Sequence, residues 1–503
     1  MSNQETVDIV IIGSGVGGAT TAAALAPTGA RILVLERGAR LRDSEAARDA
    51  RAIFQRGHFR PNETWLDGEG QPFNPGNYYY VGGNSKLYGA VLIRYRAEDF
   101  APISYREGTT PGWPFGYDEL EPWYTRAEKL YSVRGALGTD RTEPRHSEPY
   151  PFPPVPDEPS IAKVRDRMKR AGLHPFPLPL GVDIETWLKR AKTPWDAFPD
   201  TGTGKMDAEC CGINEALRHA NVELRENAKV ERLMLDADGK RIAKVETVIS
   251  GEQTTIGARL VILSAGAVNS AALLLASSDK GIANRSGAVG RHFMNHNCSA
   301  VLAIDPLTIN DSVYQKTIGI NDFYLDDGKG GPPLGNVQLL GRVTGPILKS
   351  NVRRAPEWAL NVMSRRAVDW YAMSEDLPNL ESRVTVDGGQ IRLDWKRSNW
   401  AAHQGLVKAF KERLRAAGYP IVLSQPFDRR TPSHQCGTVR IGADPATSPL
   451  DPYCRAWEHP NLFVVDASFL PTSGGVNPAL TIAAQALRVA DHIARTELRT
   501  LGI

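Results

Sequence analysis

Three glycines near the start of the chain constrain the fold more than any other feature of the sequence. Gly13, Gly15 and Gly18 form a G-x-G-x-x-G motif between a β-branched run at residues 8–12 and a small-residue segment at residues 19–26. The run is typical of a buried parallel strand, and the segment that follows is typical of a helix. The first glycine permits a tight turn, the second lets a pyrophosphate approach the backbone, and the third lets the helix pack closely. The motif therefore predicts a βαβ unit that binds a dinucleotide.

An acidic residue narrows the choice of dinucleotide. Glu36 lies 18 residues after Gly18, at the end of the second predicted strand, RILVLE. A carboxylate at this point accepts hydrogen bonds from the adenosine ribose hydroxyls and repels a 2′-phosphate. The pair of features favours FAD or NAD over NADP and does not separate FAD from NAD.

Length and composition set broader limits. At roughly 150 residues per domain, 503 residues predict two or three interlocked domains. Hydrophobic residues make up 42% of the chain and charged residues 23%, which excludes disorder and coiled coil as overall descriptions. With 60 basic and 57 acidic residues the net charge is +3, so we expect no nucleic-acid or membrane partner and a small, neutral ligand.

The cysteines and the N-terminal segment indicate the cellular compartment in which the protein is expected. Five cysteines, two of them adjacent at Cys210 and Cys211, do not resemble a disulfide scaffold. Basic residues do not precede the first apolar stretch, and glycine soon interrupts it, so it resembles neither a secretory signal nor a membrane span. We therefore expect a cytoplasmic protein with reduced thiols.

The texture of the chain changes several times along its length. Residues 102–199 are rich in proline, with one predicted helix at residues 117–131, and resemble a lid or insert. A strand, glycine turn and small-residue helix recur at ARLVILSAGAVNSAALLLAS, which predicts a second nucleotide-fold piece. Further on, strands at 383–386 and 391–395 are predicted to flank a Gly388-Gly389 turn within a substrate domain built on a sheet. The fold class is therefore α/β with α+β character. A glycine- and proline-rich segment, 326–333, is an ordinary surface turn or a gate.

The end of the chain separates FAD from NAD. In VNPALTIAAQA, Pro478 suits the first position of a helix, which predicts Asn477 as the N-cap of the last helix. Gly474 and Gly475 just before it permit close approach to a flat ligand, and a helix N-terminus attracts an anionic acceptor such as the N1–C2=O edge of reduced flavin. Asp466 ends a strand at a position suited to the ribityl chain or the pyrophosphate. These features favour FAD.

Several motifs in order give the chain a family resemblance. They are DIVIIGSGVGGAT, VGGNSKLYGAVLIR, WPFGYDELEPWYTRAEKLYSVRG, LSAGAVNSAALLL, VGRHFMNH, SEDLPNLESRVTV, SHQCGT and VDASFLPTSGGVNPALTIAAQALRVADHI. Together they extend over nearly the whole chain, which resembles the glucose-methanol-choline (GMC) flavoprotein oxidoreductases. The resemblance implies a discontinuous Rossmann-like FAD-binding domain (1–100, 205–300 and 432–503) with an inserted lid and sheet-based substrate domain (101–204 and 301–431).

The resemblance also implies a mode of cofactor binding. Gly83, Asn84, Asp466, Asn477 and Pro478 match positions at the cofactor, beside the glycines of the N-terminal motif. The pairing of His434 with Asn477 looks more like the pyranose oxidase and bacterial glycoside oxidase branch than the branch with two histidines. In pyranose 2-oxidase a histidine of a GGxxxH segment attaches to flavin, whereas here Leu87 and Tyr88 follow GGNSK. We therefore expect noncovalent FAD.

The expected chemistry is alcohol oxidation. A neutral imidazole suits removal of a hydroxyl proton near neutrality, so His434 is the candidate base while hydride moves to flavin N5. Asn477 would orient the substrate oxygen and stabilise its developing charge. By resemblance we expect oxidation of a secondary hydroxyl of a sugar or glycoside, at C3 or else C2, with oxygen or another acceptor reoxidising the flavin. Arg94 and Gln435 are candidates for contacts to sugar hydroxyls.

The same residues are also compatible with other functions. Oxidation of a sterol or aliphatic alcohol, or a lyase of the same fold that keeps FAD without net redox, are the rival functions. His292 and His296 have the i, i+4 spacing of a zinc motif but lack its glutamate and a third ligand, so we expect no metal. Cys436, close to His434, is expected to be a packing residue, as are the adjacent cysteines.

Overall fold

The main sheet grows out of the strand, glycine turn and helix at the start of the chain. The computed structural model describes residues 5–428, 430–431 and 434–502. Its central strand β1 (Thr6–Ile12) pairs in parallel with β2 (Ile32–Leu35) on one side and β11 (Glu252–Leu263) on the other. The remaining strands are the parallel β8 (Val222–Arg225) and β19 (Leu462–Val464) and the antiparallel β9 (Ala228–Leu235) and β10 (Ile242–Ile249). Segments far apart in sequence therefore form one sheet, and the predicted α/β class is confirmed.

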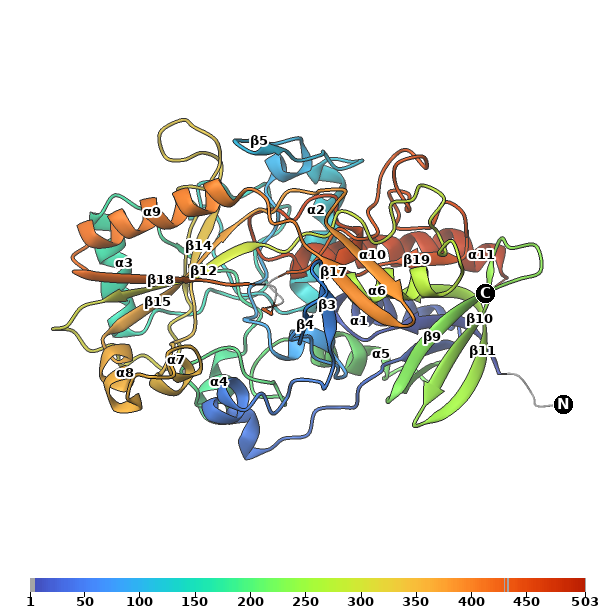
Figure 1. Ribbon diagram of the computed structural model, residues 1–503, viewed down its shortest axis with the longest axis horizontal. Helices are drawn as coiled ribbons and strands as arrows, with labels where there is room; N and C mark the ends of the chain where they lie inside the picture. The colour runs from blue at the N-terminus through green and yellow to red at the C-terminus, as the bar shows by residue number, and fades with distance from the viewer. Residues whose placement is uncertain (1–4, 429, 432–433, 503) are drawn as a thin grey trace.

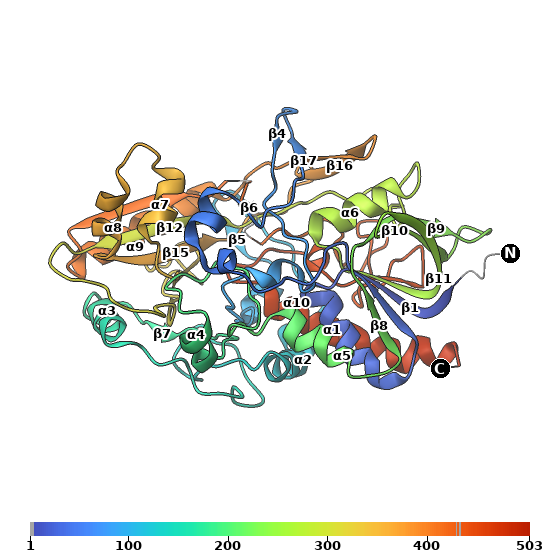
Figure 2. The ribbon, with the colours of Figure 1, turned by 90° about the horizontal axis from the view of Figure 1, so that it is seen from below.

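Helices cover both faces of this sheet. Figure 2 shows α1 (Val16–Leu25), α5 (Asn214–Ala216) and α10 (Ala479–His492) on one face and α6 (Ala267–Ala276) on the other. The helix α2 (Tyr117–Leu130), predicted to within one residue, packs against α10 from outside. The turn before α1 is tight: a Cβ atom on Gly18 would lie 2.1 Å from the carbonyl oxygen of Gly13. Close approach of helix and turn thus requires glycine, as the motif predicts.

A second sheet lies at the other end of the long axis (Figure 1). Its order is β18 (Ile421–Pro426), β12 (Asn297–Ile304), β15 (Ala367–Ser374), β14 (Asn336–Leu339), β13 (Ile318–Ile320) and β7 (Phe176–Pro177). Every residue of β15 is buried, because α9 (Trp400–Ala416) packs on one face and α8 (Glu357–Ser364) also contacts the strand. The edge-to-face pair of Trp370 and Phe410, 5.1 Å between ring centroids, joins sheet and helix. The core here also includes residues of α3 (Pro159–Arg170).

A third sheet of four strands contains the predicted hairpin. The strands β16 (Arg383–Asp387) and β17 (Gln390–Asp394) confirm the predicted pair, and Gly388 and Gly389 between them both have positive φ. β17 pairs in parallel with β3 (Trp65–Asp67), and β3 pairs in turn with β4 (Pro72–Phe73). β16 packs against α6, so the hairpin reaches over the first sheet. The smaller elements are β5 (Ser104–Tyr105), β6 (Gly108–Thr109), α4 (Ile184–Arg190), α7 (Gly345–Asn351) and α11 (Leu498–Thr500).

In the described part of the chain, none of the helices is both long enough and apolar enough to cross a bilayer.

Candidate active site

One large cavity collects most of the residues singled out in the sequence. It has a volume of about 680 Å³, and segments from all along the chain line it. The predicted residues on its wall are Gly13, Gly15, Glu36, Gly83, Asn84, His434, Gln435, Asp466, Asn477 and Pro478. Gly18 instead packs behind the turn. A volume of this order suits an extended cofactor together with a small substrate.

The N-terminal glycines form a cradle on one side of the cavity. Gly15 is the N-cap of α1, and no described atom outside its chain neighbours lies within 4 Å of the position that a Cβ would occupy. A Cβ on Gly83 would lie 3.1 Å from the Cα of Gly15, so this second loop closes on the first. The N–H groups at the start of α1 therefore meet open space between two glycine turns, as a pyrophosphate requires. The residues present fit the predicted dinucleotide.

Glu36 holds the rim of this cradle. Its carboxylate accepts hydrogen bonds from the backbone N–H of Ser14 (3.0 Å) and the hydroxyl of Ser14 (2.6 Å), and from the backbone N–H of Gly38 (2.9 Å). Burial raises the pKa of Glu36, and these hydrogen bonds oppose that shift. Since a carboxylate has about four acceptor positions, it retains capacity for a ribose hydroxyl.

Asp466 holds a second turn at the cavity wall. Its Oδ2 accepts from the backbone N–H of Gly266 (3.1 Å) and from the hydroxyl of Ser270, and its Oδ1 accepts from the backbone N–H of Ser468 (2.8 Å). Burial raises the pKa of Asp466 against the opposing effect of these bonds. The aspartate thus fixes the turn before α6 beside the wall that it lines.

His434 and Asn477 meet at another part of the same wall. The Nδ2 atom of Asn477 lies 3.4 Å from Nε2 of His434. The backbone of His434 has φ +69°, a left-handed conformation that is uncommon outside glycine and is often found at functional sites. The prediction that Asn477 is the N-cap of the last helix is wrong: Pro478 occupies that position, and the Oδ1 of Asn477 accepts from Nε2 of Gln338 at 3.1 Å. The amide therefore faces the histidine and not the helix end.

A second histidine lies behind His434. The Nδ1 atoms of His296 and His434 are 2.8 Å apart, with the rings at an interplanar angle of 80°. The Nε2 of His296 lies 2.9 Å from the carbonyl oxygen of Ser473 and 2.6 Å from that of Gly474. The ring is buried, with 2% of His296 exposed. His434 is therefore held on both ring nitrogens, by His296 on one side and Asn477 on the other.

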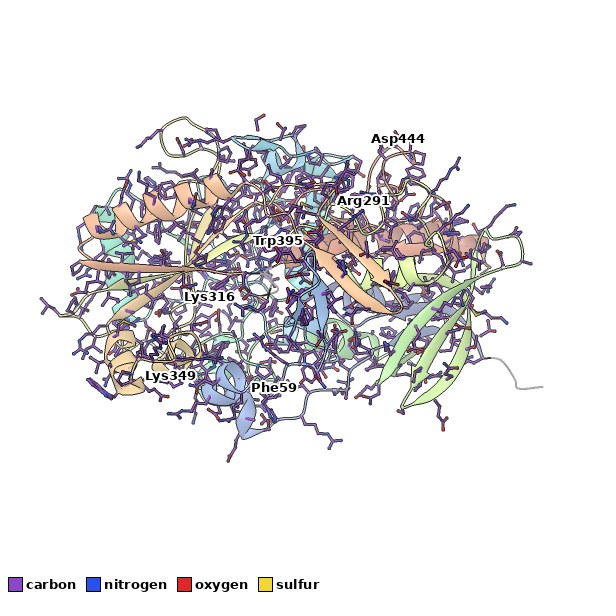
Figure 3. The ribbon with its side chains drawn as sticks, viewed as in Figure 1. Phe59, Arg291, Lys316, Lys349, Trp395 and Asp444 are labelled. Atoms are coloured by element: carbon purple, nitrogen blue, oxygen red, sulfur yellow. The ribbon has the colours of Figure 1, made fainter. Side chains whose placement is uncertain are left out.

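The surroundings keep His434 uncharged. Burial lowers its pKa well below the ordinary value of 6.5, and the electrostatic interactions with His296 and Lys316 act in the same direction. Lys316 is itself buried against Asp196 and lies near the middle of the long axis (Figure 3). The structure thus holds a neutral imidazole at the cavity wall at neutral pH.

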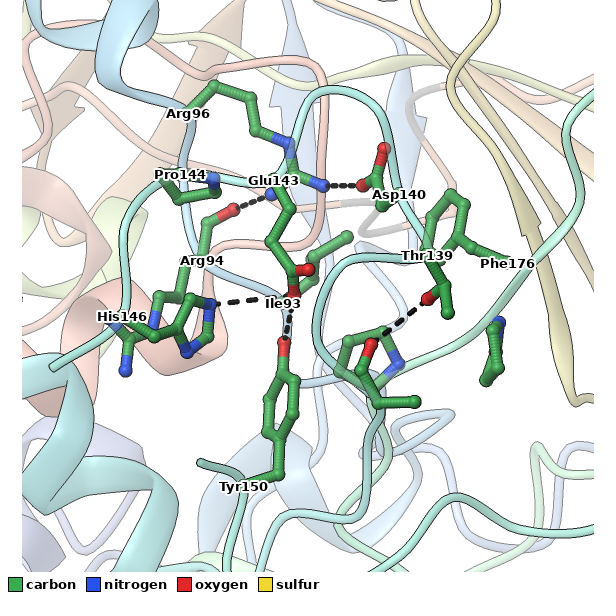
Figure 4. A pocket seen from close by; sticks show the side chains of 13 residues that line it. Ile93, Arg94, Arg96, Thr139, Asp140, Glu143, Pro144, His146, Tyr150 and Phe176 are labelled. Carbon is green, nitrogen blue, oxygen red and sulfur yellow. Dashed lines mark hydrogen bonds and ion pairs between the residues drawn. The ribbon is translucent and has the colours of Figure 1, made fainter. Parts of the chain in front are cut away.

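Arg94 does not reach this cavity. Its Nε and Nη2 donate to the carboxylate of Glu128, both at 2.7 Å, and its Nη1 donates to Glu121 at 3.0 Å and to Tyr117 at 2.9 Å. The space beside it, drawn in Figure 4, measures about 10 Å³, which is too small for a sugar. The side chain is buried and its donors are engaged, so the structure corrects the prediction that Arg94 contacts substrate. Gln435 does line the large cavity.

Two contacts around His434 and Asn477 were not singled out from the sequence. His296 appeared there as one half of a weak zinc-like spacing, and Gln338 did not appear at all. The described residues hold no cluster of three or more His, Cys, Asp or Glu arranged to bind a metal ion. His292 lies apart from this contact, with burial lowering its pKa to about 3. The signal that could have drawn attention to His296 is the VGRHFMNH motif, which is one of the segments that carry the family resemblance.

Comparison with known proteins agrees with this geometry. The family described as FAD dependent oxidoreductase matches residues 8–294, which include the cradle, and the family described as GMC oxidoreductase matches residues 378–486, which include His434 and Asn477. The chain is thus an FAD-dependent oxidoreductase.

Individual relatives narrow the class. The 6'''-hydroxyparomomycin C oxidase of Streptomyces lividus is 30% identical over 97% of this chain and 92% of its own. The paromamine 6'-oxidase of Streptomyces fradiae is 29% identical over 97% of this chain and 91% of its own. The chain belongs to the GMC oxidoreductase family. The solved structure of pyridoxine 4-oxidase from Mesorbium loti shares the fold, with a TM-score of 0.69 at 20% identity over 97% of this chain and 99% of that one.

Proposed function

We propose that this enzyme oxidises a ring hydroxyl of a sugar or glycoside to a ketone, with C3 as the first choice of position and C2 as the second. The observation that carries the proposal is the contact of His434 with Asn477 on the wall of the cavity that the glycine cradle also lines. The names of two relatives, oxidases of paromamine and of a hydroxyparomomycin, support an aminoglycoside or other sugar-like substrate class. The amide of Gln435 on the same wall suits sugar hydroxyls.

Each side chain has a role set by its protonation. Nε2 of His434 removes the hydroxyl proton, which a neutral imidazole with a lowered pKa does at neutral pH. The Nδ2 group of Asn477 donates to the same substrate oxygen and stabilises the charge that develops there. As the O–H and C–H bonds of the alcohol break, the C=O bond forms. Bound FAD supplies the acceptor of the two electrons and the proton that leave the carbon.

We infer that the FAD is held without a covalent bond. Leu87 and Tyr88 line the cavity where the resembling sequence would have a histidine, and the Tyr88 hydroxyl donates to the carbonyl of Met206. Acid precipitation should leave the yellow chromophore in the supernatant. A flavin that stays with the precipitate would overturn this inference.

We further infer the division into an FAD-binding part (1–100, 205–300 and 432–503) and a substrate-binding part (101–204 and 301–431). Strands of the first part form the sheet around β1, and strands of the second part form most of the sheet around β15. β12, which begins at Asn297, belongs to the latter sheet and moves one boundary by a few residues. The boundary at 431/432 falls at the edge of the described residues.

The function is tested by mixing the purified yellow enzyme anaerobically with a panel of free sugars, O- and C-glycosides, aminoglycosides, sterols and simple alcohols. We expect loss of the oxidised flavin's visible band with the sugar class. Product NMR would then distinguish oxidation at C2, C3 or C6, the last included because paromamine 6'-oxidase is named for a 6' position. Loss of the band only with sterols or aliphatic alcohols would contradict the proposal, and loss with none of the compounds would favour a lyase.

The electron acceptor is proposed to be oxygen or another small oxidant. Admitting air to the reduced enzyme distinguishes the two. Fast return of the visible band with hydrogen peroxide release identifies an oxidase, whereas a slow return that quinones or dyes accelerate identifies a dehydrogenase.

A further inference from the structure

We propose that His296 is a positioning residue that fixes the tautomer of His434, so that the Nε2 atom of His434 carries no hydrogen and faces Asn477. The proposal rests on the proposed function insofar as His434 is the base. Its physical content is a chain of hydrogen bonds whose direction is set at one end by the backbone.

The direction begins at two carbonyl oxygens. Nε2 of His296 lies 2.9 Å from the carbonyl of Ser473 and 2.6 Å from that of Gly474. Carbonyl oxygens only accept hydrogen bonds, so Nε2 of His296 must carry a hydrogen. Burial lowers the pKa of His296 to about 4, so the ring is neutral at neutral pH. A neutral ring with a hydrogen on Nε2 has a bare Nδ1.

The next contact passes this direction to His434. The two Nδ1 atoms are 2.8 Å apart, a hydrogen-bond distance that needs one donor and one acceptor. Since Nδ1 of His296 is bare, Nδ1 of His434 is the donor. Neutral His434 then has its lone pair on Nε2, which is the atom that faces Asn477. The tautomer needed by a base is therefore imposed before any substrate arrives.

The same donor-to-acceptor direction continues through the hydrogen bonds of Asn477. A bare Nε2 on His434 requires that the nearer group of Asn477 be the Nδ2 donor, which leaves Oδ1 of Asn477 as the acceptor on its other side. Nε2 of Gln338 lies 3.1 Å from that oxygen and donates to it. Gln338 is buried, with 1% exposed, on the strand β14 of the second sheet. Asn477 thus presents a donor, and not an acceptor, beside His434.

The backbone at which this series of hydrogen bonds begins is itself held by hydrogen bonds. The hydroxyl of Ser473 donates to the carbonyl of Asp376 and accepts from its N–H, both at 3.0 Å, and the N–H of Gly474 donates to Oε1 of Glu375 at 3.0 Å. These bonds hold the two carbonyls that face His296. Rigid support of this kind keeps a donor or acceptor in place without reorganisation during the reaction.

The direct test is the protonation state of the ring nitrogens. We would label the holoenzyme with ¹⁵N-histidine and assign His434 by difference against His434→Ala. The expected spectrum at pH 7 shows His434 protonated on Nδ1 and bare on Nε2, and His296 protonated on Nε2. A spectrum with hydrogen on Nε2 of His434 would overturn the proposal.

Two variants of His296 give an independent readout. An asparagine amide oxygen reaches about as far as Nδ1 of histidine, so His296→Asn retains an acceptor for His434, whereas His296→Phe keeps the ring and removes the acceptor. We expect His296→Phe to slow anaerobic flavin reduction by about 10- to 100-fold, the usual cost of losing the partner that orients a histidine, with substrate affinity unchanged. His296→Asn should recover most of that loss. Equal rates in both variants and the wild type would contradict a positioning role.

The experiments separate this proposal from the proposed function. If His434→Ala reduced flavin at the wild-type rate, His434 would not be the base. The ¹⁵N spectrum of the wild type would still report the direction of the hydrogen bonds from His296 through His434 to Asn477. If His434→Ala is slow but His296→Phe is not, the base stands and the positioning role of His296 falls.

Discussion

Two parts of the cavity wall differ in what holds them. The cradle consists of backbone: Gly13 and Gly15 shape it, and Glu36 fixes its rim through hydrogen bonds to residues close by in the fold. The reacting corner consists of side chains, with His434 and Asn477 in front.

The residues that support the corner are distant in sequence from the pair in front. Gln338 on β14 and His296 just before β12 lie behind the front pair, so four separate segments meet there. The cradle does not depend on particular side chains of the second sheet. The corner does, because its side chains meet only when the second sheet lies correctly against the first. The comparison teaches that cofactor binding and reactivity should respond separately to substitution.

The largest expected effect lies in the corner. Asn477→Ala removes the donor to the substrate oxygen and should slow anaerobic flavin reduction by about 10²- to 10³-fold, as loss of such a donor does in other enzymes. Stopped-flow absorbance measures this rate. The matched control is Asn284→Ala, an amide outside the residues that line the cavity, which donates to the carbonyl of Lys280 at 2.9 Å, and we expect a far smaller change there. Equal losses in the two variants would erase the distinction.

Arg94 tests whether a buried ion pair outside the cavity affects stability alone. Arg94→Met leaves the carboxylates of Glu121 and Glu128 without their buried partner and should lower the free energy of unfolding by about 3 kcal/mol or more. Chemical denaturation measures this loss. Arg126→Met, on the exposed face of α2, is the control and should cost less than about 0.5 kcal/mol. A raised KM for the glycoside without loss of stability would return Arg94 to the substrate.

Two glycines of the cradle separate cofactor binding from folding. A Cβ on Gly15 meets only open space, so Gly15→Ala should fold normally yet bind FAD at least about tenfold more weakly, or about 1.4 kcal/mol. A Cβ on Gly18 would lie 2.1 Å from the Gly13 carbonyl, so Gly18→Ala should destabilise the protein itself by about 1–3 kcal/mol. Flavin titration and denaturation of each apoprotein measure the two effects. Identical behaviour of both variants would show that the cradle does not face the cofactor.

The smallest expected effect is that of pH on the rate of flavin reduction, which should stay constant as pH falls through 6.5. Because burial lowers the pKa of His434 well below 6.5, the neutral base persists as pH falls through 6.5, and flavin reduction should decline only at lower pH. The sign for stability is the same: the contribution of the neutral ring is complete above 6.5 and is lost as pH falls towards the lowered pKa. Anaerobic reduction measured from about pH 5 to 9 covers this range. A midpoint at or above 6.5 would contradict a buried neutral base.

The cradle could be predicted from sequence because its determinants are local. The spacing of Gly13, Gly15, Gly18 and Glu36 follows from the turn, the helix and the next strand, and each element was found within a few residues. The hairpin around Gly388 and Gly389 was predictable for the same reason, since a left-handed turn leaves a mark in the sequence.

The corner depended on contacts that spacing does not encode. Arg94 and Gln435 looked equivalent as polar residues near motifs, yet tertiary packing gives Arg94 two buried carboxylates and leaves Gln435 on the cavity wall. Asn477 was predicted as a helix cap because Asn-Pro favours that role, but Gln338 from another sheet binds its side chain. Pairing of His296 with His434 spans 138 residues, a separation at which no local pattern forms.

The most direct test of the central claim compares the wild type with His434→Ala in a single anaerobic turnover with a glycoside. FAD content should be equal, since the cradle is untouched, and flavin reduction should slow by about 100-fold or more, the usual contribution of a general base. Wild-type reduction rates in the His434→Ala enzyme would contradict the account.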